Sequence, residues 1–154
     1  MRHRGAATLA AVALALVLSG CGGGDRLSKS QYQRHLTSDT QEIRKAFLPL
    51  STPPSSMGEL AGKLKVGESQ LNDAANDLEG LNPPKEIEKD NKTLAKGLHK
   101  FAEELDSFRK AAEKEDPQLL RKTFADLQRS HALVDVRNAT TDMKKKGYKL
   151  SGLG

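Results

Sequence analysis

Residues 84–117 read PKEIEKDNKTLAKGLHKFAEELDSFRKAAEKEDP and carry the clearest helical periodicity in the chain. The apolar positions fall at the spacing of one helix face, namely Ile87, Leu94, Leu98, Phe101, Leu105, Phe108 and Ala112. Pro83 precedes another proline and is therefore pushed out of helical geometry, which makes Pro84 a natural first helical residue. The pattern predicts one long amphipathic helix with a single buried face.

A further helix is predicted directly after it. Asp116 is suited to the N-cap and Pro117 to the first helical position. The apolar pattern then continues and drifts in phase, through Leu120, Phe124, Leu127, Val134, Val136, Ala139 and Met143. Gly147 is a candidate left-handed residue, and Tyr148 would pack back on Met143 in a Schellman stop. We expect one helix from Pro117 to this stop.

Two helices are predicted before residue 84. Ser28 and Gln31 form a capping box for the first helix, and Pro49 should end it near Phe47. Its apolar face consists of Tyr32, Leu36, Ile43 and Phe47, with Thr40 in phase. A second capping box, Ser56 with Glu59, starts the next helix.

The second predicted helix has a narrow apolar stripe and ends at Gly80, a candidate left-handed stop. Three glycines lie inside it: Gly58, Gly62 and Gly67. Each costs about 1 kcal/mol of helix stability relative to alanine. They either permit a neighbouring helix to approach closely or make the first half of this helix less stable.

Four amphipathic helices, short connections and no strand pattern predict an all-α protein. We expect an antiparallel four-helix bundle over residues 28–154. The single cysteine of the chain, Cys21, excludes an internal disulfide.

The first 20 residues have a different character. Arg2 and Arg4 are followed by an apolar run, Gly5 to Leu18. As a helix this run would rise only about 20 Å, too little for a hydrocarbon core of roughly 30 Å. Residues 1–20 are therefore predicted to be a signal peptide. Its last residues and the cysteine, Leu18-Ser19-Gly20-Cys21, resemble the lipobox of bacterial lipoproteins.

The lipobox resemblance implies export, transfer of a diacylglyceryl group to the Cys21 thiol, and cleavage between Gly20 and Cys21. The chain would then be lipid-anchored at the extracytoplasmic face of the cell membrane, with residues 21–27 as lipidated cysteine and flexible tether. The mature part also resembles small helical lipoproteins of Gram-positive bacteria, through Leu81–Pro84 and Lys146–Tyr148. That resemblance implies no activity and no site residues.

The sequence holds no pattern that predicts catalysis or a cofactor. No serine lies in a Gly-x-Ser-x-Gly elbow, the lipid takes the cysteine, and no glycine loop is placed to hold phosphate. We therefore expect no enzyme. Three histidines, His35, His99 and His131, lie on different predicted helices and are weak candidates for a metal site in the bundle interior.

Charge is unevenly distributed along the mature chain. Residues 21–154 carry 23 basic and 20 acidic side chains, and residues 117–154 alone carry eight and three. Anionic headgroups or wall polymers are the expected partners of Lys144, Lys145, Lys146 and Lys149. The other interpretation is that these lysines only stabilise a helix C-terminus. Nucleic acid is not expected outside the cytoplasm.

Two functions follow from these observations. The favoured one is a membrane-anchored envelope lipoprotein that acts as a non-enzymatic interaction or structural module, whose protein partner the sequence does not name. The alternative is a carrier that holds a small ligand or a metal in the bundle interior.

Overall fold

Every regular element in residues 25–150, the range that the computed structural model describes, is a helix. The α-helices are α1 (Lys29–Phe47), α2 (Met57–Gly80), α3 (Glu88–Glu113), α4 (Pro117–Gln128) and α5 (His131–Lys145). Two short 3-10 turns are η1 (Leu48–Ser51), before α2, and η2 (Lys85–Ile87), before α3. The predicted all-α fold is confirmed.

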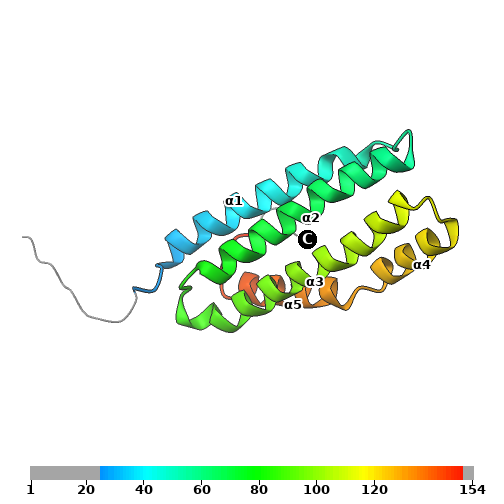
Figure 1. Cartoon of the computed structure of the whole chain (residues 1–154). Coiled ribbons are helices and arrows are strands. Elements are labelled where there is room, and N and C mark those ends of the chain that lie inside the picture. The colour runs from blue at the N-terminus through cyan, green and yellow to red at the C-terminus, as the bar shows by residue number, and fades with distance from the viewer. Residues whose placement is uncertain (1–24, 151–154) are drawn as a thin grey trace, which may run out of the picture.

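The helices form a bundle in which α2 and α3 make the most extensive pairing. Helix α1 lies along α2, while α4 and α5 follow one another back along α3 (Figure 1). The start of α1, the connection between α2 and α3, and the end of α5 therefore meet at one end of the bundle (Figure 1). We call this the basal end.

The single helix expected after Pro117 is wrong, because the chain breaks between α4 and α5. Ser130 caps the new helix, with its Oγ accepting a hydrogen bond of 3.1 Å from the Leu133 N–H. Because one helix ends and another begins at this break, the apolar residues before and after it do not need to share one helix phase. It turns the second set of apolar residues, Ala132, Val136, Ala139 and Met143, into the bundle, whereas Val134 is left 48% exposed.

Three predicted helix ends are confirmed by their hydrogen bonds. The Ser28–Gln31 capping box is complete, and Asp116 Oδ1 accepts from two N–H groups at the start of α4. Gly147 has a φ of +80°. The Tyr148 N–H bonds to the Met143 carbonyl at 3.1 Å and the Gly147 N–H to the Lys144 carbonyl at 2.9 Å, which is a Schellman stop.

Three other local predictions need correction. Gly80 does not adopt a left-handed conformation, and α2 ends by extension of the chain at Leu81. The second capping box is incomplete, because Ser56 accepts from the Glu59 N–H but the Glu59 carboxylate accepts from Ser55. Pro84 precedes η2 rather than starting α3.

The core lies between the helices and is built mainly of leucine and alanine. On α3 the predicted stripe is buried at Leu94, Leu98 and Leu105, while Phe101 and Phe108 are only partly buried. Helix α4 contributes no fully buried residue, and its Phe124 is 51% exposed. The half of the bundle farthest from the basal end is therefore the less completely packed half.

Glycines set two of the helix contacts. A Cβ on Gly97 of α3 would lie 2.8 Å from Val136 Cγ2, so α5 approaches α3 more closely than a side chain there allows. On α2, a Cβ on Gly67 would meet the Phe47 ring at 3.2 Å, whereas a Cβ on Gly62 would meet nothing within 4 Å. Of the two interpretations of the α2 glycines, close approach holds for Gly67.

Candidate functional site

The first described residues are held against the α2–α3 connection. The Leu27 N–H donates to the Asn82 carbonyl at 2.8 Å. The Arg26 guanidinium donates to the Pro83 carbonyl at 2.8 Å and pairs with Glu88 at 2.9 Å. The described part of the chain therefore begins at the basal end.

The C-terminal segment returns to the same place. The Tyr148 ring, 2% exposed, packs edge-on against Tyr32 with centroids 5.7 Å apart. Lys29 Nζ lies 4.7 Å from the Tyr148 ring centroid and donates to the Lys146 carbonyl at 2.8 Å. The Tyr148 hydroxyl donates to Glu86 at 2.8 Å. Two causes raise the pKa of Tyr148, of which burial is the larger and the hydrogen bond to Glu86 the smaller.

The apolar residues of this C-terminal segment, Tyr148, Leu150 and Leu153, lead us to expect that it inserts into a membrane interface beside the lysines. Burial corrects this expectation. Both Tyr148 and Leu150, the latter 7% exposed, instead belong to the core. Their apolar surface is thus already buried inside the bundle. Leu153 lies outside the described residues.

The net positive charge of residues 21–154 is located at the basal end. The segments that meet there are residues 25–29, 82–90 and 142–150. They carry eight basic and five acidic side chains, net +3. This equals the whole net charge of residues 21–154, so the remainder of that range is neutral, with 15 side chains of each sign.

The four C-terminal lysines proposed from sequence differ in their surroundings. Lys146 reaches inward, with Nζ 2.6 Å from Asp90 and 2.7 Å from the Glu86 carbonyl. Lys145 pairs with Asp142 at 2.9 Å and lowers the pKa of that carboxyl. Lys144 and Lys149 are exposed, and within residues 25–150 their side chains form no hydrogen bond or ion pair.

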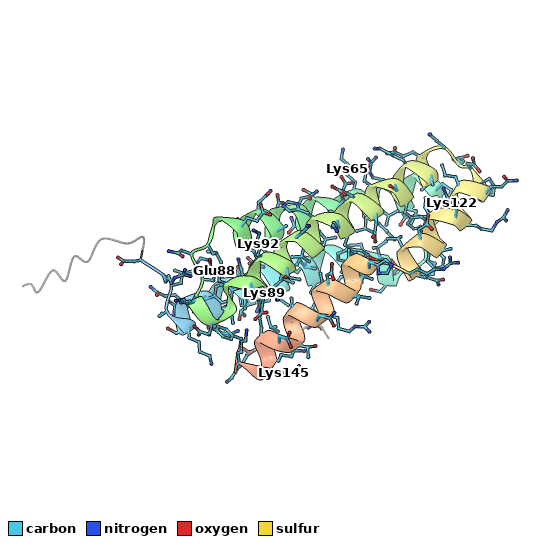
Figure 2. The ribbon with its side chains drawn as sticks, turned by 90° about the horizontal axis from the view of Figure 1, so that it is seen from below. Lys65, Glu88, Lys89, Lys92, Lys122 and Lys145 are labelled. Atoms are coloured by element: carbon cyan, nitrogen blue, oxygen red, sulfur yellow. The ribbon has the colours of Figure 1, made fainter. Side chains whose placement is uncertain are left out.

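Two further lysines belong to this surface and were missed from sequence. Lys85 of η2 and Lys89 of α3 are exposed and likewise lack a side-chain ion pair with any described residue. Lys89 and Lys145 lie at the basal end, whereas Lys65 and Lys122 lie toward the other end (Figure 2). No local pattern links Lys85 with Lys144, because only the folded chain brings the α2–α3 connection beside the end of α5. We call Lys85, Lys89, Lys144 and Lys149 the basal lysines.

The three histidines do not converge. His35 and His131 are exposed on α1 and α5. His99 on α3 lies 3.0 Å from Asn72 Oδ1 and 3.8 Å from a Glu79 oxygen. Among residues 25–150, no group of three or more His, Cys, Asp or Glu side chains is arranged to hold a metal ion.

A buried carboxyl group lies between α1 and α2. Asp39 is 8% exposed, and its Oδ2 has no hydrogen-bond partner within the described structure. Burial, with smaller contributions from Asp77 and Glu42, raises the Asp39 pKa to about 6. This carboxyl is thus charged at neutral pH at a cost to stability.

Cys21 and the signal-peptide prediction lie outside the described residues. Within the described range, no helix has the length and apolar character needed to cross a membrane. In comparisons with known proteins, no family model, no curated protein and no solved structure matches this chain.

Proposed function

We propose that this chain is a lipid-anchored envelope protein whose bundle stands with its basal end on the membrane and serves as a non-enzymatic interaction module. The observation that carries the proposal is the coincidence of two features. The lipobox-like Leu18–Cys21 precedes the bundle directly, and the net positive charge lies at the end where the chain enters the bundle.

Covalent geometry supports the same orientation. Three glycines separate Cys21 from Asp25, and the four Cα–Cα steps between the two residues span at most about 14 Å when fully extended. An acylated Cys21 would therefore hold the basal end within roughly one to two Debye lengths of the lipid headgroups at 0.1 M salt. Basal lysines that approach an anionic surface to within one Debye length, which this tether length permits, each contribute about 1 kcal/mol of attraction.

The anchor is tested on the full chain in a bacterial host. Mass spectrometry of the membrane fraction should show an acylated Cys21 as the first residue. Cys21→Ser should leave the protein unprocessed or release it from the membrane. An unmodified Cys21 in membrane-extracted protein would contradict the proposal.

The orientation is tested separately, on residues 22–154, since the described core lies wholly within residues 27–150. Binding to vesicles should increase with anionic lipid content and fall with salt. Replacing all four basal lysines by Gln should abolish most of this binding. The matched control replaces four exposed lysines elsewhere, Lys65, Lys100, Lys114 and Lys122, and changes the net charge equally.

The control set should retain most of the vesicle binding if the basal surface is the contact. Equal losses in the two sets would mean that net charge alone attracts the bundle, and the basal orientation would be wrong. The anchoring result is independent of this outcome.

A further inference from the structure

The bundle is open between α1 and α5. Helix α1 packs along α2 and helix α5 along α3, but no packing of comparable extent joins α1 to α4 or α5 within residues 25–150. At the basal end the C-terminal segment bridges this gap, since Gln33 of α1 accepts from the Lys149 N–H at 2.6 Å. Farther along the bundle, a groove lies between the two helices.

The groove is lined by apolar side chains from four helices and encloses about 280 Å³. Its lining residues are Ile43, Phe47, Leu71, Leu98, Phe101, Leu133 and Val136. Leu71 and Leu98 form a floor that is almost fully buried, and Leu133 at the mouth is 38% exposed. An interior of this kind, between the helices of a bundle, is a common place for a small apolar ligand.

A cationic side chain lies beside this apolar interior. A second hollow, of about 360 Å³, shares Ile43 and Phe47 with the groove and is further lined by Arg44, Leu48 and Ser51. Arg44 is exposed, and its guanidinium forms no hydrogen bond or ion pair with a described residue. Ile43 and Phe47 line both hollows, so Arg44 lies in the hollow next to the apolar groove.

From this geometry we infer that the groove binds a single-chain anionic amphiphile, with its acyl chain between α1 and α5 and its acidic headgroup on Arg44. The volume favours one chain. At about 280 Å³ the groove lies at the small end of the range for ligand pockets, which suits one chain of medium length rather than two. Guanidinium groups pair well with carboxylate and phosphate, so charge complementarity selects an acidic headgroup. The inference does not depend on the lipid anchor.

The first test is titration calorimetry of residues 22–154 with octanoate, decanoate and dodecanoate. Each additional methylene that enters the groove should strengthen binding about fourfold, the ratio that corresponds to about 0.8 kcal/mol per buried methylene. The gain should stop once the chain fills the groove. Decyltrimethylammonium, which has the same chain length as decanoate and the opposite charge, should bind more weakly.

The second test uses two pairs of neighbouring residues. Leu133 lines the groove and Val134 does not, although both are exposed on α5. Leu133→Asp should abolish decanoate binding, and Val134→Asp should leave it unchanged. Arg44→Gln should weaken binding about tenfold, because it removes a charge-assisted hydrogen bond. Lys45→Gln, one residue away and outside both hollows, is its control. Thermal melting followed by circular dichroism checks that each variant folds.

Three results would overturn the inference. The first is no decanoate binding to a folded domain. The second is equal binding by the Leu133→Asp and Val134→Asp variants. The third is a stable dimer in light scattering that Leu133→Asp converts to monomer, because a second copy of the chain would then cover the groove.

Discussion

The hydroxyl of Tyr32 on α1 donates a hydrogen bond of 2.7 Å to Oδ1 of Asn91 on α3, and both side chains are buried. The same amide group donates from Nδ2 to the Leu78 carbonyl on α2 at 2.8 Å. A single asparagine therefore connects three helices near the basal end. Because α1 packs mainly on α2, this link fixes its position relative to α3.

Removal of the Tyr32 hydroxyl tests the importance of this link. Tyr32→Phe should lower the free energy of unfolding by about 1–3 kcal/mol, because the buried Asn91 oxygen loses its donor. Tyr148→Phe is the control, since its acceptor Glu86 is exposed and water can replace the hydroxyl. Urea titration measures both. Equal losses would show that the Asn91 link has no special role.

The close approach of α3 and α5 gives a second prediction. Gly97→Ala should cost about 1–3 kcal/mol, because the added methyl group overlaps Val136 and the backbone of α5. Gly62→Ala, which meets open space on α2, should instead stabilise by about 0.5–1 kcal/mol through its helix propensity. Thermal or denaturant unfolding should give shifts of opposite sign. A stable Gly97→Ala variant would mean that the helices can separate without loss.

The buried Asp39 predicts a pH dependence. Its pKa is about 6 in the folded state against 3.8 for the free group, so the folded chain holds this proton more tightly. The contribution of Asp39 to stability therefore decreases as pH rises from about 4 to about 6, and its full cost is present above that range. The difference between the two values corresponds to a cost on the order of 3 kcal/mol.

Asp39→Asn should accordingly stabilise the bundle at pH 7.5, by about 1–3 kcal/mol, and have little effect below pH 4. Denaturant titrations across this range measure the difference between the two proteins. Asp77→Asn removes one of the carboxylates that face Asp39 and should give a smaller gain. A difference that does not change between pH 4 and 7.5 would contradict the assignment.

Lys146 and Lys144 should have different roles, the first in the stability of the fold and the second in binding to anionic vesicles. Lys146→Gln should cost about 1–2 kcal/mol, because Asp90, with its side chain 11% exposed, loses a charged partner. Lys144→Gln should change stability by less than about 0.5 kcal/mol, as is usual for an exposed side chain. In the vesicle assay, Lys144→Gln alone should still weaken binding.

Several helix ends were predictable from sequence because their interactions are local. The Ser28–Gln31 box, the Asp116 cap and the Gly147 stop each involve hydrogen bonds within about one or two turns, so the residues that form them stand close together in the sequence. In the sequence, the helix break at Ser130 is indicated only by the change of phase in the apolar pattern after Leu127. Ser130 lacks the Glu or Gln three residues later that would complete a capping box, so by itself it does not predict a helix start.

The sequence by itself determined that this protein is all-α, where most of its helices begin and end, and which faces of α1 and α3 are buried. Helix periodicity and capping depend on residues a few positions apart, and those are read directly from the chain. Tertiary structure alone decided three further features: the proximity of the basal lysines to one another, the ion pair of Lys146 with Asp90, and the apolar groove between α1 and α5. Each depends on segments that lie 50 or more residues apart, and only packing brings those segments together.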